Sequence, residues 1–235
     1  MHRFFILLTL IVLFNSGEIL FYIDLNIIII HNYIMIIKSI AETSYSGMFK
    51  VAPQEGSAFF VRKEYLSENL FEKIDVGADF DETETGFLLD AGLACAAELK
   101  AVSYLARAEQ SRFGLTRKLI EKKFDKKYVE AALSYLEKRG YLSDRRFATA
   151  WLNTRKINHY EGRSRLLAEL SSRGISRDVA SEALNEFFCE HDESEICKKA
   201  YEKLAKNKSG DKLTAALIRQ GFSLKQIRET QTSES

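Results

Sequence analysis

The chain has 235 residues, of which 46% are apolar and 29% are charged, and its formal net charge at pH 7 is +1. This length and apolar content are sufficient for a substantial core, in one elongated domain or in two smaller ones. A net charge so close to zero predicts no class of partner, and the three cysteines, Cys95, Cys189 and Cys197, exclude a disulfide framework.

The charges are unevenly distributed along the chain. Residues 98–186 contain 19 Lys and Arg against 12 Asp and Glu, whereas residues 1–97 contain 6 against 13. The tail from Glu190 is nearly balanced, with 9 against 8. The basic excess therefore lies in the middle of the chain, and a partner selected by charge is expected to contact this part.

Residues 1–47 are rich in isoleucine and poor in charge. An uncharged apolar run at 4–14 resembles the apolar region of a signal peptide, and a second apolar run at 27–37 is interrupted by His31 and Asn32. Neither run reaches the roughly 18–20 residues that a membrane-spanning helix requires.

Three interpretations of this leader remain open: a signal or membrane anchor, a buried pair of strands, and upstream sequence translated from an early start. We favour the third, with Met35 or Met48 as the true start, because the composition changes abruptly at Lys50. We therefore expect residues 1–47 to be an apolar leader that is either outside the native chain or disordered.

Residues 48–92 are expected to form a small N-terminal extension that contains β-structure, such as a hairpin. Residues 58–66 are rich in the β-branched and aromatic side chains that are typical of a strand. Residues 79–83 begin like a calcium-binding loop, but Glu84 stands where such a loop requires glycine. We interpret this stretch as an exposed acidic loop.

A helical pattern begins near Leu93 and recurs three times. In each copy a leucine is followed four residues later by a second leucine, then by Phe or Ile, and then by Asp or Ser. The Phe or Ile positions, 124, 175 and 222, are 51 and 47 residues apart, which indicates stacked helical repeats. The predicted three-helix units are residues 93–140, 141–190 and 191–235.

Each copy of the pattern predicts a joint between two helices. Gly174 and Gly221 lie where a helix ends in the left-handed conformation, which glycine adopts without steric cost. The following Phe or Ile packs back on the preceding helix, and the next Ser or Asp caps the following one. Lys123 replaces the glycine in the first unit, where a left-handed residue would cost about 1–2 kcal/mol.

The predicted fold is therefore mainly α. It consists of three tandem three-helix, helix-turn-helix-like repeats that form an elongated, curved body, with the small β-containing extension at the N-terminus. The tail beyond Ile227 is polar, so the last helix is expected to be short.

The repeats resemble the RecX family of regulatory proteins. The most specific string is Gly-Tyr-Leu-x-Asp-x-Arg-Phe-Ala at 140–148, and the resemblance continues through residues 103–112, 153–155 and 164–175. Gly114 departs from the family pattern, which usually has a capping glutamate there, and Lys123 departs from the joint glycine.

The resemblance implies a non-enzymatic modulator of the RecA recombinase. Such a protein binds RecA and its filament on DNA, and it mostly inhibits ATPase and recombinase activity in DNA repair, homologous recombination and the SOS response. We expect a cytoplasmic monomer without a cofactor or a membrane contact. DNA phosphates within the filament are a second expected partner, and weak binding of free DNA is a third.

Basic side chains are the candidates for these contacts, because Arg holds a phosphate or carboxylate in a two-point fork. In the middle repeat they are Arg145, Arg146, Arg155, Lys156, Arg163, Arg165 and Arg173. In the first repeat they are Arg112, Lys118 and Lys122. Trp151 shares a helical stripe with Phe147, and we interpret it as a core residue rather than a stacking platform.

Two other functions are alternatives to this one. Helix pairs could read duplex DNA directly, but only Arg177 begins a second helix with a base-contacting side chain in the middle unit. An enzyme is not expected, because the sequence has no phosphate-cradling glycine loop, no His-Glu-x-x-His and no evident nucleophile–base pair. We assign no catalytic residue. We also assign no metal ligand, because Cys189, His191 and Cys197 match no zinc spacing.

Overall fold

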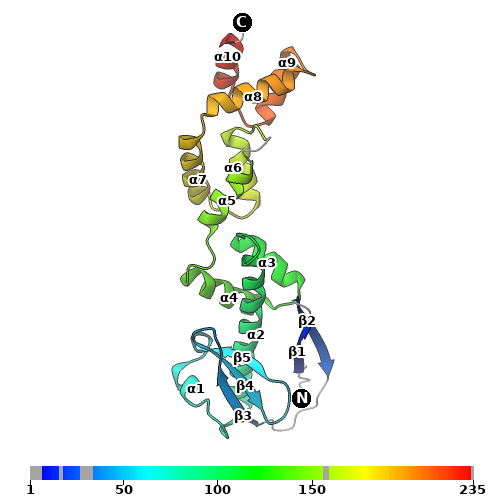
Figure 1. Ribbon diagram of the computed structural model, residues 1–235, viewed down its shortest axis with the longest axis vertical. Coiled ribbons are helices and arrows are strands. Elements are labelled where there is room, and N and C mark those ends of the chain that lie inside the picture. The colour runs from blue at the N-terminus through cyan, green and yellow to red at the C-terminus, as the bar shows by residue number, and fades with distance from the viewer. Residues whose placement is uncertain (1–6, 16–17, 27–33, 156–158, 234–235) are drawn as a thin grey trace, which may run out of the picture. The chain divides into compact units, whose positions relative to one another are not determined.

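The computed structural model describes residues 7–15, 18–26, 34–155 and 159–233 (Figure 1). The chain forms two compact units. The first contains residues 1–101 and 122–135, and the second contains residues 102–121 and 136–235. Because α2 (Glu82–Leu105) and α4 (Lys126–Lys138) cross these boundaries, the first helical repeat is divided between the units.

The first unit contains two antiparallel sheets. One is a hairpin of β1 (Leu7–Asn15) and β2 (Glu18–Asn26), and the other has four strands in the order β5-β4-β3-β6. The four strands are β3 (Met35–Glu42), β4 (Met48–Pro53), β5 (Phe59–Arg62) and β6 (Asp79–Phe80). The expected β-containing extension is thus confirmed as a four-stranded sheet, and its strand β3 lies within the predicted leader. The leader residues 1–6, 16–17 and 27–33 lie outside the described residues.

The core of the first unit is formed by the four-stranded sheet and two helices. Met35, Ile37, Val51 and Phe80 from the strands are buried together with Leu88 of α2. The short helix α1 (Glu68–Glu72) adds one buried leucine, and a single 3-10 turn, η1 (Lys63–Tyr65), precedes it. Met35 and Ile37 of β3 and Met48 and Val51 of β4 are buried, whereas the polar side chains Lys38 and Lys50 of these strands are exposed.

A buried ion pair fastens the sheet to α2. Arg62 at the end of β5 donates from Nε and Nη2 to the two carboxylate oxygens of Glu98, at 2.8 and 2.6 Å, and both side chains are only 4% exposed. Tyr65 donates its hydroxyl to the same carboxylate at 2.8 Å, and burial raises the pKa of this phenol. The guanidinium also lies 4.3 Å from the ring of Tyr135 in α4. Each buried polar group of this cluster therefore has a partner, as burial requires.

The acidic stretch near residue 80 is not a loop, so that interpretation was wrong. Asp79 and Phe80 form β6, and α2 begins at Glu82 rather than near Leu93. The Asp81 carboxylate accepts from the Glu84 N–H at 2.9 Å, and the Glu84 carboxylate accepts from the Asp81 N–H at 3.1 Å. The two acidic side chains cap the helix reciprocally, and their spacing of three residues is the local signature of a capping box.

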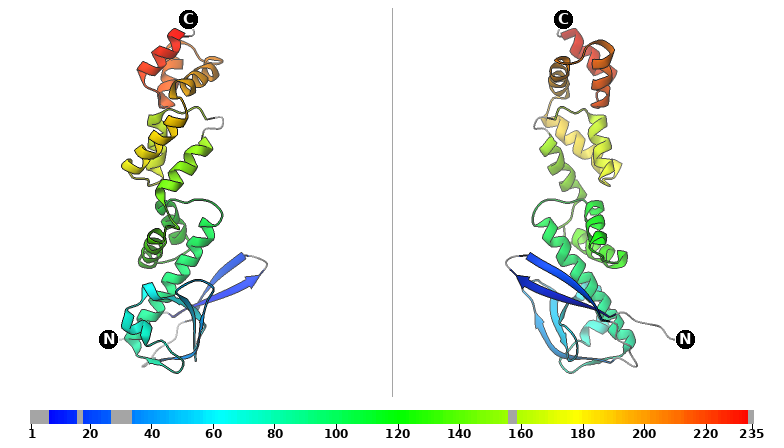
Figure 2. Two further views of the ribbon diagram at one scale, coloured as in Figure 1. Left: turned by 60° about the vertical axis from the view of Figure 1, so that its left-hand side comes forward. Right: turned by 90° about the vertical axis from the view of Figure 1, so that its right-hand side faces the viewer.

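The second unit contains two complete three-helix repeats (Figure 2). Repeat 2 consists of α5 (Asp144–Arg155), α6 (Arg163–Ser172) and α7 (Arg177–Glu190). Repeat 3 consists of α8 (Glu193–Ala205), α9 (Gly210–Arg219) and α10 (Leu224–Ser233). The unit also contains α3 (Arg112–Glu121), the middle helix of repeat 1. The prediction of three three-helix repeats is confirmed, although α10 is as long as α9 and not shorter.

The helix joints have the predicted chemistry. Gly174 and Gly221 have φ angles of 79° and 96°, and the N–H groups of Ile175 and Phe222 donate to Leu170 O and Leu217 O at 3.2 and 3.3 Å. These are the hydrogen bonds of a Schellman motif. Lys123 also has a positive φ of 69°, so the first joint accepts the left-handed residue despite its side chain. Ser111, Asp125, Ser143, Ser176 and Ser223 all cap a helix N-terminus.

Neighbouring repeats are joined by equivalent contacts. Ser111 Oγ, before α3, donates to Arg173 O at 2.9 Å, and the Gly162 N–H, before α6, donates to Gln220 O at 2.8 Å. In both cases the N-terminal end of a middle helix meets the carbonyl just before the joint glycine of the next repeat. A Cβ built on Gly174 would lie 2.3 Å from Phe113 Cβ, so no side chain fits between the repeats there.

A second pair of equivalent hydrogen bonds reinforces this contact. The first N–H group of α3, from Arg112, donates to Asp144 Oδ1 at 2.8 Å, and the first N–H group of α6, from Arg163, donates to Glu193 Oε1 at 3.3 Å. Both acceptors are acidic residues in the first turn of the next repeat. The first N–H group of each of these helices is thus satisfied by the neighbouring repeat.

We predict that Gly162→Ala destabilises the second unit by about 1–3 kcal/mol, because its Cβ would lie 2.5 Å from Gly221 O in well-packed backbone. Gly86→Ala is the matched control, since Gly86 lies inside α2 with no atom within 4 Å of its added Cβ. That variant should gain about 0.5–1 kcal/mol from helix propensity. Denaturant unfolding measures both values, and equal effects would contradict the close approach of the two repeats.

We also predict that Phe222→Ala costs about 3–5 kcal/mol in the free energy of unfolding, because Phe222 is buried in the core of repeat 3. Phe124 occupies the equivalent joint but is only half-buried, so Phe124→Ala should cost clearly less. Urea denaturation of the two variants tests the difference. A loss below about 1 kcal/mol for Phe222→Ala would show that the joint is not a core position.

Candidate functional site

The predicted basic residues fall mainly on the second unit. Arg145, Arg146 and Arg155 lie on α5, Arg163 and Arg165 lie on α6, and Arg173 follows α6 directly. Arg112 and Lys118 lie on α3, whereas Lys122 belongs to the first unit and is exposed. Lys156 lies outside the described residues.

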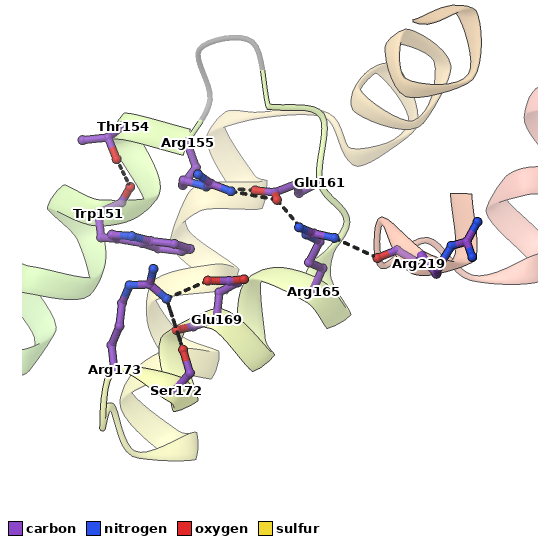
Figure 3. A network of polar contacts seen from close by, with 9 residues as sticks. All are labelled: Trp151, Thr154, Arg155, Glu161, Arg165, Glu169, Ser172, Arg173 and Arg219. Carbon is purple, nitrogen blue, oxygen red and sulfur yellow. Dashed lines mark hydrogen bonds and ion pairs between the residues drawn. The ribbon is translucent and has the colours of Figure 1, made fainter. Parts of the chain in front are cut away.

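A buried carboxylate organises the centre of this group (Figure 3). Glu161, which is 5% exposed, accepts from Arg155 Nε and Nη2 at 3.0 and 2.8 Å and from Arg165 Nε at 2.7 Å. Arg165 Nη1 donates further to Arg219 O of repeat 3 at 3.2 Å. One carboxylate therefore fixes two guanidinium groups, and the second of these also contacts the next repeat.

A second carboxylate fixes Arg173 beside the indole of Trp151. Arg173 Nη1 donates to the Glu169 carboxylate at 2.7 Å and to Glu169 O at 2.6 Å. This hydrogen bond lowers the pKa of the Glu169 carboxyl. The guanidinium carbons of Arg173 and Arg155 lie 4.6 and 5.5 Å from the ring centre of Trp151, in the range of cation–π contacts. Trp151 packs on the core of repeat 2, as predicted, and also orients two arginines (Figure 3).

The remaining predicted arginines are held by carboxylates or carbonyls at the surface. Arg145 donates to Glu186 at 2.5 Å and lies 3.9 Å from Glu182. Arg146 donates to Glu109 at 2.8 Å and to two backbone carbonyls. The side chain of Arg163 donates to the amide oxygen of Asn185 and that of Arg112 to Glu137, and Lys118 donates to Gln110 at 2.7 Å. The structure therefore brings Arg155, Arg165 and Arg173 into one network and leaves the others in separate pairs.

Glu161, Glu169 and the Arg219 carbonyl were not predicted to belong to the site. The two glutamates precede Arg165 and Arg173 by four residues, which is the spacing of side-chain pairs on a helix, so this signal was available. The contact of Arg165 with Arg219 joins residues 54 positions apart and has no local signal.

Two cavities open between repeats 2 and 3, and both are lined by Arg155, His159, Tyr160 and Glu161. The larger has a volume of about 520 Å³ and is also lined by acidic residues at the end of α7, in the α7–α8 turn and on α8, namely Glu190, Asp192 and Glu195. The smaller has about 280 Å³ and is also lined by Arg165, Lys203 and Gln220. The described residues contain no group of three or more His, Cys, Asp or Glu placed to bind a metal ion. Among these residues no helix is both long and apolar enough to cross a bilayer.

The fold and this network define a class of proteins built from tandem three-helix repeats joined through glycine turns. A family model for the second three-helix domain of RecX matches residues 143–184. The chain is 40% identical to the regulatory protein RecX of Treponema pallidum (strain Nichols) over 133 residues, which are 56% of this chain and 81% of that protein. It is 32% identical to the one from Chlorobium phaeobacteroides (strain BS1) over 136 residues, 55% of this chain and 87% of the relative. The chain belongs to the RecX family.

Two solved structures have a similar fold. A crystal structure of regulatory protein RecX covers 83% of this chain and 99% of its own, with a TM-score of 0.66 at 21% identity. The RecX structure from Lactobacillus salivarius covers 60% and 96%, with a TM-score of 0.53, also at 21% identity. At this identity the likeness supports the arrangement of helices and carries no side-chain detail.

We predict that Glu161→Ala destabilises the second unit by about 2–3 kcal/mol, because it leaves two partly buried guanidinium groups without their common partner. Glu169→Ala is the control, since that carboxylate is 35% exposed, whereas Glu161 is 5% exposed, and it holds one arginine instead of two. Its loss should stay below about 1 kcal/mol. Thermal and urea unfolding of the two variants measure the difference, and a Glu161→Ala variant as stable as wild type would disprove the buried network.

Proposed function

We propose that this chain is a non-enzymatic regulator that binds the RecA recombinase and its filament on DNA and mostly inhibits recombinase and ATPase activity. Its place would be the cytoplasm, where it acts as a monomer in DNA repair, homologous recombination and the SOS response. Membership of a family of regulatory proteins supports the regulatory role. The choice of RecA as partner comes from the family that the sequence resembles.

The observation that carries the proposal is the ordered group of three guanidinium groups on repeat 2. Arg155, Arg165 and Arg173 are 25, 38 and 35% exposed, so each is held in place and still reaches solvent. Within the described part of the chain, Nη1 of Arg155 and Nη2 of Arg165 and Arg173 donate no hydrogen bond. Oriented N–H groups of this kind bind phosphate or carboxylate with little loss of side-chain entropy.

The ion pairs within the chain indicate which part of the basic surface is best able to bind an anionic partner. Arg145 has two carboxylates within 4 Å, so its charge is compensated within the chain. Arg173 has one carboxylate and the face of Trp151, and its remaining N–H groups are available to a partner. We therefore place the contact with the filament, through DNA phosphates or acidic side chains of RecA, around Arg173, Arg165 and Arg155.

We predict that Arg173→Ala weakens inhibition of DNA-dependent ATP hydrolysis by RecA about five- to tenfold, through the loss of one charge-assisted contact. Arg145→Ala is the control, because it removes the same charge from a pair that is already compensated, and it should change inhibition less than twofold. The measurement is a titration of the RecA ATPase with the full-length chain. Equal inhibition by Arg173→Ala and wild type would exclude this surface.

A DNA-binding measurement, with and without assembled RecA, separates the proposal from direct reading of duplex DNA. If helix α7, which begins at Arg177, reads base edges, excess duplex DNA of mixed sequence should bind the chain far more weakly than a selected site does. If the filament is the partner, mixed-sequence DNA should bind weakly, and assembled RecA should strengthen binding. Strong sequence preference without RecA would favour the DNA-reading alternative.

A further inference from the structure

We propose that the smaller cavity between repeats 2 and 3 is a phosphate-binding site, which accepts a nucleic-acid backbone phosphate or a free phosphate ion. Phosphate binding itself is independent of the proposed function. Only the nucleic-acid source of the phosphate rests on that function. The cavity has a volume of about 280 Å³, which is the volume of about nine water molecules, so a phosphate group fits with several waters.

The charge of the cavity is suited to an anion. Among its described lining residues, Arg155, Arg165 and Lys203 are cationic and only Glu161 is acidic. The excess of two positive charges lies in a concave site, where the field is stronger than on an open surface.

The hydrogen-bond geometry leaves donors for such an anion. The Glu161 carboxylate accepts hydrogen bonds from Nε and Nη2 of Arg155 and from Nε of Arg165. The Arg219 carbonyl accepts one from Nη1 of Arg165. Within the described residues, Nη1 of Arg155 and Nη2 of Arg165 therefore keep their N–H groups. Glu161 is a positioning residue here, because it fixes both guanidinium planes and lies almost completely buried.

Residues of both repeats line the site. Arg155 and Arg165 belong to repeat 2, whereas Lys203 lies on α8 of repeat 3, with its ammonium nitrogen 5.6 Å from the ring centre of Tyr160. Tyr160 in turn packs on the core of repeat 3. A phosphate bound by all three cations would bridge the repeats next to the hydrogen bond between Gly162 and Gln220. Binding is therefore expected to stabilise this junction as well.

The larger cavity is the natural comparison. It shares Arg155 and Glu161 but is also lined by Glu190, Asp192 and Glu195, so its acidic side chains repel an anion. Lys199 lines this larger cavity, and Lys203 lines the smaller one, one helical turn further along α8. The two exposed lysines form a matched pair of variants.

The test is a titration of the full-length chain with inorganic phosphate at constant ionic strength, by calorimetry and by tryptophan fluorescence. Trp151 is the sole tryptophan, and its ring centre lies 5.5 Å from the Arg155 guanidinium carbon, so it reports on this site. We expect saturable binding by wild type and by Lys199→Gln. Lys203→Gln should bind about three- to tenfold more weakly, since it loses one charged contact.

Absence of saturable phosphate binding to wild type in both measurements would overturn the proposal, as would an equal loss in the two lysine variants. Unfolding midpoints of the variants in the absence of phosphate check that both remain folded. A short single-stranded oligonucleotide that displaces phosphate identifies nucleic acid as the source, and failure to displace it identifies the free ion. If the wild-type chain binds phosphate but does not inhibit RecA, the result counts against the proposed function alone.

Discussion

The structure of the helical repeats depends on one close approach, between the N-terminal end of a middle helix and the joint glycine of the next repeat. At Gly174 an added Cβ would meet Phe113 Cβ at 2.3 Å, and at Gly221 it would meet the Arg165 backbone nitrogen at 2.5 Å. These glycines therefore satisfy two conditions, a positive φ angle and the absence of a side chain. Lys123 satisfies only the first, and its side chain is exposed. This explains why the first joint tolerates a lysine at a cost of about 1–2 kcal/mol in backbone strain.

The close contact between neighbouring repeats also positions the residues of the candidate site. Because backbone meets backbone at Gly162 and Gly221, Arg165 comes within hydrogen-bond distance of the Arg219 carbonyl, and the lining of the smaller cavity includes residues of both repeats. Glu161 lies at this junction with its carboxylate buried among the arginines that it orients. Stability of the junction and orientation of the basic groups are therefore two consequences of one packing arrangement.

Internal ion pairs reduce the positive charge that the middle of the chain presents to a partner. Counting charges along the sequence treats every arginine as available, but Arg145, Arg146 and Arg112 each contact a carboxylate 25 or more residues away. Such pairs contribute little to stability when they are exposed. They do reduce the charge that a partner meets, and this leaves the arginines beside Trp151 as the part of the surface best prepared for an anion.

The sequence by itself determined the number of repeats, the positions of their joints and the capping residues, because helix ends obey local rules that recur at fixed spacing. It also identified the family and the arginines of repeat 2. Only the tertiary structure decided that β3 belongs to the sheet and which arginines share Glu161. Met35 of β3 pairs with Phe80 of β6, and the arginine network reaches Arg219 of repeat 3, so these features involve residues distant in the chain. The cap formed by Asp81 and Glu84 is local, since the two residues are three positions apart. The physical reason is that a side chain's partner is set by packing of whole repeats, whereas a turn or a cap is set by the few residues that form it.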